Sequence, residues 1–294
     1  MPDAPRVVIV TLNWNRPADT LAFLQTALAQ QGLDCPIIVV DNGSSDDSID
    51  QISAAYPEVE IIATGKNLGF AGGCNVGLRR ARELDADYVF LVNNDTLLAP
   101  DCLSQLVAHT APEVGLLAPV FFYADAPSRP WLLGGNLHPI LYEITGDTAT
   151  WFAKLQAQGS LDLDMVPFCG VLLSRAALAQ VGEFDERFFM YYDDMDYSAR
   201  LRRAGFTLRI IATAHLWHKV SSSSGGRDSP NERYWMARSS VLYFRKYVRG
   251  WRWLCVGPYR LMSALRQTVR LSQQRNWPAL RSYWKGLGDG LFKV

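Results

Sequence analysis

The feature that most constrains the fold is a series of four short apolar runs, each followed by a polar turn and a helical pattern. The runs occupy residues 6–12, 36–40, 59–63 and 88–92. Continuous runs rich in Val and Ile are typical of strands that are buried on both faces of a parallel sheet. Strands that alternate with helices at this spacing predict a parallel α/β sheet.

The pattern between residues 121 and 212 is less regular. Between residues 121 and 167 the pattern has no clean period, and we expect an irregular segment over the face where the strands end. Regular elements are predicted again beyond it: a strand at 168–173, a helix at 175–181, a helix that stops at Gly205 and a strand at 208–212.

Polar residues follow three of the first four strands at the point where each strand ends. These clusters are Asn13–Asn15, Asp41–Ser45 and Asn93–Asp95. In α/β sheets ligands bind where the strands' carboxyl ends open onto loops. A carboxylate at Asp95 can bind a divalent cation that also holds a diphosphate, although Asp after a strand also caps helices. The Asp41 segment fits either a nucleoside pocket or an ordinary turn.

The segment 65–77 is rich in glycine and resembles a phosphate-binding loop. It contains neither GxGxxG nor the GK[ST] ending of a P-loop, so neither nucleotide fingerprint applies. Its glycines would let the backbone approach a ligand or a neighbouring strand closely. Asn67 and Asn75 would then supply side-chain hydrogen bonds.

Three carboxylates, Asp193, Asp194 and Asp196, lie within four residues. They repel one another, so a purely structural surface gains little from them. Aromatic residues at 188–192 precede them, and an apolar environment raises the pKa of a carboxyl group toward that of a general base. Acidic residues are also typical of helix N-termini. Both interpretations hold together if Asp196 stabilises the helix while Asp194 faces the crevice.

His218 is followed by Lys219 and by the serine- and glycine-rich residues 221–226. An isolated histidine is more often packed or exposed than bound to a metal. The serine-rich segment is typical of a flexible loop. Its functional interpretation is a lid that brings Lys219 and Arg227 close to phosphates.

The chain resembles the inverting family-2 glycosyltransferases with the GT-A fold through seven motifs in the family's order. They are VTLNWNR, VVDNGSSDDS, GKNLGFAGGCNVGLRRA, YVFLVNNDT, PFCGVLLSR, VGEFDERFFMYYDDMDYSARLRRAG and HLWHKVSSS. The resemblance covers about residues 6–250 and points to the bacterial rhamnosyltransferase-type branch. It implies a Rossmann-like, mostly parallel sheet flanked by helices, and a metal-dependent hexosyltransferase.

The resemblance also implies roles for individual residues. The nucleotide-sugar donor would be held by Thr11, Asn13, Asp41, Asn42, Asn67, Gly69, Phe70, Asn75 and Asn94. Asp194 would be the catalytic base, and Asp95 and His218 would bind the metal. Support of the site or the acceptor would come from Asp193, Gly170 and Lys219. Two positions depart from the family pattern, since Asn93 leaves Asp95 as the sole charge of its motif and Asp193 replaces a glutamate.

The implied reaction moves a sugar from a UDP- or dTDP-type donor to a hydroxyl of a lipid-linked or cell-envelope glycan, with Mg²⁺ or Mn²⁺ as cofactor. Rhamnose is one candidate, and galactofuranose, glucose and N-acetylhexosamines stay open. Two other functions compete with this one. The first is a sugar nucleotidyltransferase, which also uses an α/β sheet and a carboxylate-bound metal. The second is a non-catalytic relative that binds sugar nucleotides or lipids.

We expect a catalytic domain over residues 1–230, with a nucleotide-sugar half to about residue 120 and an acceptor half beyond it. Residues 231–294 carry 13 lysines and arginines against two acidic residues, and five of the nine tryptophans. Apolar residues recur there at helical spacing at Leu261, Met262, Leu265 and Val269. This composition predicts a basic amphipathic helical extension that either contacts an anionic membrane surface or caps the catalytic domain.

Nucleic acid is not expected as a partner, because no recognition motif accompanies the positive charge. The N-terminus lacks a signal-peptide pattern and no apolar run reaches about 20 residues. We therefore expect a cytoplasmic protein that is peripheral at the inner face of the cell membrane. The five cysteines form no CxxC pair and argue against a disulfide framework or a structural zinc site. These patterns do not determine the oligomeric state.

Overall fold

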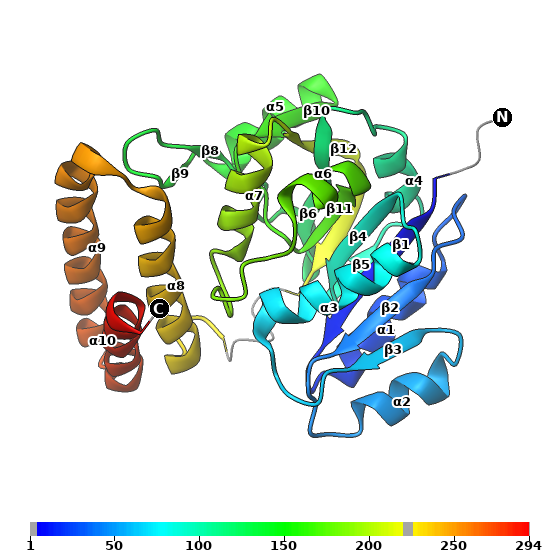
Figure 1. The fold of residues 1–294 in the computed structure, drawn as a ribbon, viewed down its shortest axis with the longest axis horizontal. Coiled ribbons are helices and arrows are strands. Elements are labelled where there is room, and N and C mark those ends of the chain that lie inside the picture. Colours follow the sequence, from blue (N-terminus) through cyan, green and yellow to red (C-terminus); the bar gives the residue numbers. More distant parts are fainter. Residues whose placement is uncertain (1–4, 220–225, 294) are drawn as a thin grey trace.

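The computed structural model describes residues 5–219 and 226–293. Its centre is a sheet flanked by helices, and three long helices form a bundle beside it (Figure 1). The four apolar runs form the parallel half of this sheet, in the order β4-β1-β2-β3, as predicted. These strands are β1 (Val7–Asn13), β2 (Ile37–Asp41), β3 (Glu60–Ala63) and β4 (Tyr88–Asn93). They are joined by α1 (Pro17–Leu28), α2 (Ser48–Ala55) and α3 (Gly69–Glu83).

The other half of the sheet is mixed. Antiparallel β11 (Gly170–Ser174) lies between β4 and β6 (Val114–Tyr123), and β6 pairs in parallel with β12 (Thr207–His218). β5 (Thr96–Leu98) and β10 (Ser160–Leu163) pair with β12, and β7 (Ala126–Pro130) pairs with β6. A separate two-stranded sheet consists of β8 (Asn136–Leu137) and β9 (Ile144–Thr145). The helices of this half are α4 (Cys102–Val107), α5 (Thr148–Gln158), α6 (Arg175–Val181) and α7 (Asp193–Arg203).

The glycine-rich segment 65–77 is mainly helix, which corrects the expectation of a loop. Most of it forms the first turns of α3, and Gly73 and Gly77 face β1. A Cβ atom at Gly73 would lie 2.6 Å from Leu12 Cδ2, and one at Gly77 would collide with the side chain of Val10. These glycines therefore allow close packing of a helix on a strand, the second of the two roles considered for them.

The segment 121–167 is more regular than its sequence predicts, because it contains α5. The Asp147 carboxylate caps α5 by accepting a hydrogen bond from the backbone N–H of Thr150 (2.9 Å). Gly159 ends the helix with φ +78°. The capping residues indicate this helix, but its apolar residues do not recur at clear helical spacing. Hydrophobic periodicity alone therefore does not predict it.

The predicted strand at 208–212 is part of a longer one. β12 continues to His218 and has an irregular register between Ile211 and His215, which interrupts its apolar alternation. The helix predicted to stop at Gly205 ends at Arg203, as expected.

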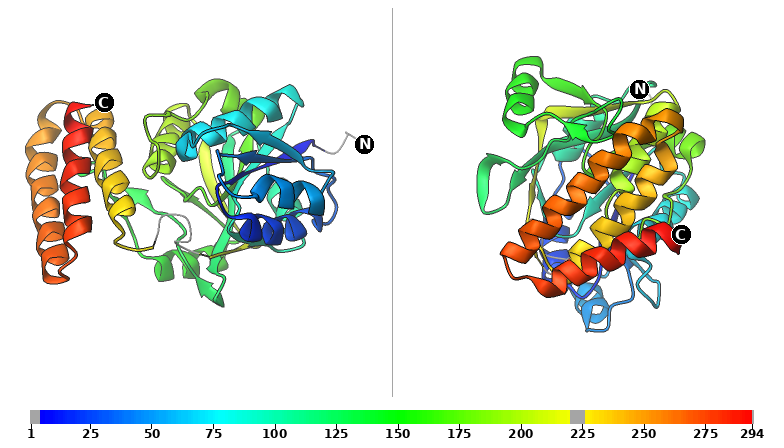
Figure 2. Two further views of the ribbon diagram at one scale, coloured as in Figure 1. Left: turned by 90° about the horizontal axis from the view of Figure 1, so that it is seen from below. Right: turned by 90° about the vertical axis from the view of Figure 1, so that its left-hand side faces the viewer.

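Most of residues 231–293 is helical, as predicted for this segment. Their elements are α8 (Pro230–Tyr247), the short η1 (Gly250–Arg252), α9 (Trp253–Gln273) and α10 (Trp277–Phe292). α8 lies against the catalytic domain, while α9 and α10 form the outer side of the bundle (Figure 2). Leu242, Tyr243 and Phe244 of α8 pack against buried Phe188, so the cap interpretation holds for this helix. In the described part of the chain, no helix combines the length and apolarity needed to cross a bilayer.

Candidate active site

The carboxyl ends of β1, β2 and β4 bring the predicted polar clusters together. Asn13 is the register neighbour of Asp41, and its Nδ2 donates to Asp41 Oδ2 (2.9 Å). The hydroxyl of Thr20, in α1, donates to Asn13 Oδ1 (2.8 Å) and accepts from Asn94 Nδ2 (2.8 Å). All four side chains are buried. They form a continuous hydrogen-bonded chain that fixes three strand ends relative to one another.

Asp41 also closes the turn after β2. Ser44 donates to it twice, from its backbone N–H to Oδ1 (2.9 Å) and from its hydroxyl to Oδ2 (2.6 Å). Gly43 has φ +77°, and a Cβ atom there would collide with the backbone of Lys66. The turn interpretation is therefore correct, and the turn holds the carboxylate at the edge of the predicted site.

The start of α3 is held from both sides. Asn42 Nδ2 donates to the backbone oxygen of Gly69 (2.9 Å), and Asn67 Oδ1 accepts from the Gly69 N–H (2.8 Å). On the other side, the backbone N–H of Phe70 donates to the backbone oxygen of Phe189 (2.7 Å). Gly69 has φ +76° and lies directly against Phe189. The nucleotide-side residues predicted here thus connect β2 to the segment that precedes α7.

Asp95 and His218 meet because β5 pairs with the end of β12. His218 Nε2 lies 3.2 Å from Asp95 Oδ1, and both side chains are buried. The buried Nδ1 of His218 has no hydrogen-bond partner among the described atoms. Lys219 follows, and its backbone N–H donates to the backbone oxygen of Asp95 (2.9 Å), while its Nζ donates to Asp19 Oδ1 (2.8 Å). Residues 5–219 and 226–293 contain no group of three or more His, Cys, Asp or Glu side chains suited to a metal.

Asp193 and Asp194 begin α7 after an unusual backbone segment. Tyr191 and Tyr192 both have positive φ, at 64° and 63°, which is costly for aromatic residues and sets the direction in which α7 starts. Burial raises the pKa of Asp194 to about 6, although the Met195 N–H donates to its Oδ1 (2.7 Å) and acts in the opposite direction. Burial and the charge of Asp194 raise the pKa of Asp193 well above its usual range. One or both carboxyl groups therefore hold a proton more readily than an exposed aspartate.

The Asp193–Asp194 pair and Asp95 both lie near the buried thiol of Cys169, just before β11. Burial raises the pKa of this thiol, and the charges of Asp95, Asp194 and Asp193 raise it further. Gly170 follows, where a Cβ atom would lie 2.5 Å from Leu216 Cδ1. The absence of a side chain at Gly170 thus leaves room for the side chain of Leu216 in β12.

The sequence model of glycosyl transferase family 2 matches residues 7–182. The chain belongs to this family. N-acetylglucosaminyl-diphospho-decaprenol L-rhamnosyltransferase of Mycobacterium tuberculosis is 28% identical over 265 residues, which cover 81% of this chain and 86% of the relative. The dTDP-rhamnosyl transferase RfbF of Shigella flexneri is 24% identical over 248 residues, which cover 82% and 80%. The nucleotidyltransferase interpretation is therefore replaced, and the chain is a rhamnosyltransferase-like glycosyltransferase.

A solved structure places the fold in the same class. The mannosyltransferase PcManGT from Pyrobaculum calidifontis, in complex with GDP-Man and Mn²⁺, superposes with a TM-score of 0.63 at 14% identity. The superposition covers 99% of this chain and 88% of that chain. The GT-A fold that the seven motifs imply is thus confirmed.

Two predicted donor residues of the glycosyltransferase lie away from open space. Asn75 is buried in α3, where its Oδ1 accepts from the Phe184 N–H (2.8 Å) and its Nδ2 donates to the Phe184 oxygen (3.0 Å). It holds the segment that leads to α7. Thr11 lies two residues before the end of β1 with its side chain fully buried, as that of Asn13 is, and its hydroxyl has no partner among the described atoms.

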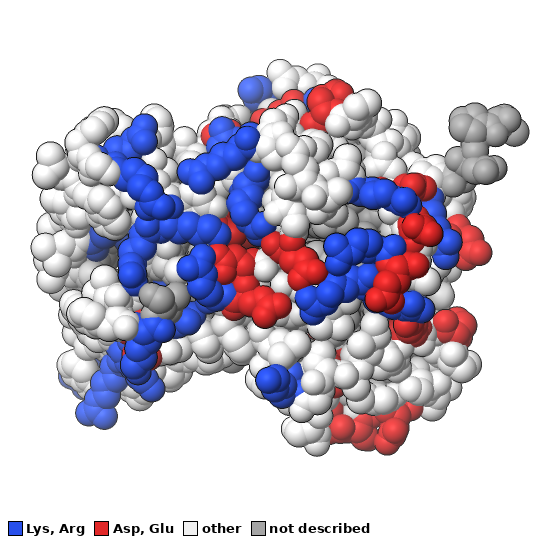
Figure 3. All heavy atoms as spheres, in the orientation of Figure 1, with Lys and Arg blue, Asp and Glu red and all other residues white. Residues whose placement is uncertain are grey.

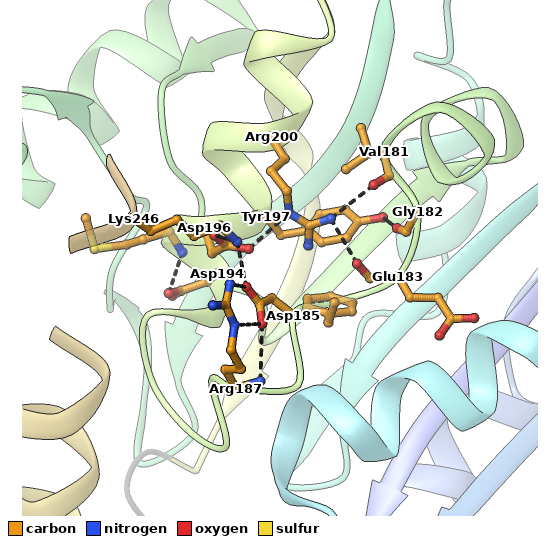
Figure 4. Close-up of polar contacts among 12 residues, drawn as sticks. Val181, Gly182, Glu183, Asp185, Arg187, Asp194, Asp196, Tyr197, Arg200 and Lys246 are labelled. Atoms are coloured by element: carbon orange, nitrogen blue, oxygen red, sulfur yellow. Dashed lines mark hydrogen bonds and ion pairs between the residues drawn. The ribbon is translucent and has the colours of Figure 1, made fainter. Parts of the chain in front are cut away.

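The glycosyltransferase also contains an ion-pair network that the sequence argument missed (Figure 4). Asp196 Oδ1 accepts from Lys246 Nζ (2.6 Å) and the Tyr247 hydroxyl (2.7 Å), and its Oδ2 accepts from Arg200 Nε (3.0 Å). Lys246 also donates to Asp185 Oδ2 (2.7 Å). α8 thereby anchors α7 and the segment before it. The spacing of Asp196 and Arg200, four residues apart, is the one sequence signal that indicates part of this network.

The lid predicted at residues 221–226 lies almost wholly outside the described residues, which omit 220–225.

Trp235 of α8 stacks on Phe189, with ring centroids 4.2 Å apart and planes 17° apart. Ser239 of α8 donates to the backbone oxygen of Met190 (2.7 Å). The segment before Asp193 and Asp194 is thus supported by α8 along most of its length.

Proposed function

We propose that the glycosyltransferase moves a rhamnose-type sugar from a dTDP- or UDP-linked donor to a hydroxyl of a lipid-linked or cell-envelope glycan, with inversion at the anomeric carbon. The names of two similar proteins, an N-acetylglucosaminyl-diphospho-decaprenol L-rhamnosyltransferase and a dTDP-rhamnosyl transferase, support this choice of sugar and acceptor. The proposal places the enzyme at the cytoplasmic side of the membrane, where a lipid-linked acceptor is held.

The observation that carries the proposal is the environment of Asp194. Its pKa of about 6 suits a group that is ionised at neutral pH and still takes up a proton readily. In the proposed step Asp194 accepts the proton of the acceptor hydroxyl. The acceptor oxygen attacks the anomeric carbon as the bond to the nucleoside diphosphate breaks on the opposite face. Burial and the charge of Asp194 raise the pKa of Asp193 well above its usual range, so a proton on Asp193 leaves Asp194 as the charged member of the pair.

Asp95 and His218 suit a divalent cation. Their facing atoms, a carboxylate oxygen and an imidazole nitrogen, lie 3.2 Å apart, and such donors suit Mn²⁺ and also Mg²⁺. A proton on the buried Nδ1 of His218 would leave Nε2 free to bind a metal. When bound, the cation would neutralise charge on the departing diphosphate. Two protein ligands leave the remaining positions to phosphate oxygens and water.

The nucleotide would lie along the ends of β1 and β2. We assign the base and ribose to Asn13, Asp41 and Asn42: Asn13 Nδ2 donates to Asp41, and the backbone N–H of Asn42 donates to the backbone oxygen of Asn13. Asn67, Gly69 and Phe70 would line the adjoining side of the cleft, and Asn94 would support the donor from β4. Lys219, whose backbone N–H donates to the backbone oxygen of Asp95, would face the phosphates or the acceptor.

The test is release of nucleoside diphosphate from a panel of dTDP-, UDP- and GDP-sugars with Mn²⁺, Mg²⁺ or EDTA, each with and without a bacterial lipid extract. We expect release from one donor, loss of activity with EDTA, and stimulation by the lipid. Release from dTDP-rhamnose identifies the sugar. Release without lipid stimulation would contradict the lipid-linked acceptor and leave the catalytic assignment intact.

The competing function is a non-catalytic binder that keeps the fold. In that case a donor raises the melting temperature of the protein while no nucleoside diphosphate appears with any acceptor extract. That result would remove the catalytic roles of Asp194 and Asp95.

A further inference from the structure

The outer surface of α9 is apolar, whereas its inner surface is polar. Leu254, Leu261, Met262, Leu265 and Val269 have exposed fractions of 78%, 59%, 52%, 45% and 54%. The buried residues of α9 are only Val256, Ala264 and Leu271. A helix on the surface of a globular protein normally turns its wide apolar face inward. α9 has the reverse arrangement.

Ion pairs hold the polar side of α9 against the rest of the protein. Arg260 donates to Glu143 Oε1 (3.2 Å) and to the hydroxyl of Ser240 in α8 (2.9 Å). Arg270 forms an ion pair with Asp228. These interactions fix the rotation of α9 about its axis, so the exposed leucines cannot turn inward while they are intact. The outward direction of the apolar face is therefore a built feature of the bundle.

The apolar face continues onto α10 and is bordered by positive charge. Trp277 and Trp284 of α10 are 52% and 47% exposed, and Trp251 before α9 is 62% exposed. The exposed cations of these two helices and of the residues next to them are Arg266, Arg275, Arg281, Lys285 and Lys293. Figure 3 shows uncharged side chains along the outer edge of the bundle and blue side chains between it and the catalytic domain. Tryptophan beside lysine and arginine is typical of segments that lie at a membrane interface.

An open recess of about 300 Å³ lies on this face, lined by Pro258, Tyr259, Met262, Ser263 and Arg266. It combines apolar walls with one guanidinium, a combination that suits the apolar chain and the phosphate of one lipid molecule. With 21 residues, α9 offers a surface about 30 Å long, which is large compared with a site for a single small ligand.

We propose that the outer face of α9 and α10 docks on a bilayer that contains anionic lipids, with the apolar side chains in the interfacial layer and the cations beside lipid phosphates. Charge decides between this occupant and a second copy of the chain. The one acidic residue in the described part of α9 and α10 is Asp289, which is paired with Lys293 and the Tyr234 hydroxyl. A symmetric dimer through this face would bring like charges together, whereas an anionic surface complements them.

The test is sedimentation of the full-length protein with vesicles of phosphatidylcholine alone or with 30% phosphatidylglycerol. We expect at least about tenfold tighter binding to the anionic vesicles, and weakening by added salt. The double variant Leu261→Glu/Leu265→Glu should lose at least about tenfold in binding. The matched control Leu28→Glu, at a leucine of α1 that is 41% exposed, should bind like the unmodified protein.

Two further measurements separate the possible outcomes. Arg266→Gln and Arg281→Gln should each weaken binding to anionic vesicles about fivefold and leave binding to neutral vesicles unchanged. Analytical ultracentrifugation of the double variant and its parent tests self-association. A dimer that the double variant converts to a monomer, together with no vesicle binding by the parent, would assign the face to a second copy of the chain. Equal vesicle binding by the double variant and the parent would also overturn the proposal.

This inference is independent of the proposed reaction. The substituted leucines lie outside the catalytic groups, so donor-dependent release of nucleoside diphosphate without lipid should be equal in the variant and the parent. Failure of catalysis and failure of docking are therefore separate results.

Discussion

Two pairs of aspartates within a stretch of twelve residues have opposite surroundings. Asp185 and Asp196 are each held by two basic side chains and share Lys246. Asp193 and Asp194 have no lysine or arginine partner within the described ranges. Burial acts against the charge of Asp185, but the hydrogen bonds from Arg187 and Lys246 outweigh it and hold the pKa of Asp185 below its usual range. The pKa values of Asp193 and Asp194 are raised.

The difference distinguishes carboxylates that hold structural elements together from the pair that contains the proposed base. Paired carboxylates are stabilised as anions, so they bind neighbouring elements together and have little affinity for a proton. Unpaired buried carboxylates cost stability and keep that affinity, which a general base requires. In this chain α8 supplies Lys246 to one pair and leaves the other pair facing the strand ends.

The largest expected effect belongs to Asp194→Asn. An amide cannot accept the proton of the acceptor hydroxyl, so kcat should fall by about 10³-fold or more, while donor affinity stays within about twofold. Steady-state rates measure the first quantity and calorimetric titration of the donor the second. Asp162→Asn, at an exposed carboxylate paired with Arg209, is the matched control and should keep the parent rate. A near-normal rate for Asp194→Asn would assign the base elsewhere.

Asp196→Asn should lower the stability of the fold and leave kcat almost unchanged. It leaves Lys246 and Arg200 without one buried partner charge, so the free energy of unfolding should fall by about 2 to 3 kcal/mol. Below the melting transition kcat should change by less than about threefold. Urea unfolding followed by circular dichroism measures the stability, with Asp162→Asn as the control, expected to lose less than about 1 kcal/mol. Equal losses in the two variants would mean that the network contributes little.

The pH dependence of stability tests the raised pKa of Asp194 in the unpaired set. The pKa of Asp194 is 3.8 as a reference and about 6 in the folded protein. Between these values the folded state binds more protons than the unfolded chain, so the carboxyl lowers stability as pH rises from about 4 to about 6. Asp194→Asn removes this loss. It should unfold with a free energy about 1 to 3 kcal/mol higher than the parent at pH 7.5, and nearly equal to it close to pH 4.

Thermal melts of the parent and Asp194→Asn at the two pH values measure this difference. A gain of the same size at both pH values would indicate better packing of the amide and would count against titration of Asp194.

The parallel half of the fold was predictable because its signals are local. β1, β2 and β4 are nearly continuous buried runs, the edge strand β3 is a short half-buried one, and Pro17 opens α1 at its first position. The mixed half was not predictable to the same degree. α5 depends on its caps at Asp147 and Gly159, and the insertion of antiparallel β11 between β4 and β6 depends on contacts between residues far apart in the chain.

The site shows the same division. Asn13, Asp41 and Asn94 meet because strand ends in a parallel sheet must lie side by side, and the meeting of Asp95 with His218 follows from the pairing of β5 with β12. The direction of a side chain is not contained in such patterns. Asn75 has a side chain that could bind a ligand, but its amide is hydrogen-bonded to the backbone N–H and oxygen of Phe184. The partners that distinguish Asp194 from Asp196 come from α8, about 50 residues later.

The smallest expected effect tests whether α8 also supports the unpaired aspartates. Trp235→Leu removes the stack on Phe189, which should lower the free energy of unfolding by about 1 kcal/mol and kcat by a few-fold, because Phe189 lies in the segment that directs Asp193 and Asp194. The matched control is Trp251→Leu, at a tryptophan that is 62% exposed, and both of its values should stay near those of the parent. A loss of stability without any change in kcat would restrict α8 to the paired aspartates and would sharpen the division between the two pairs.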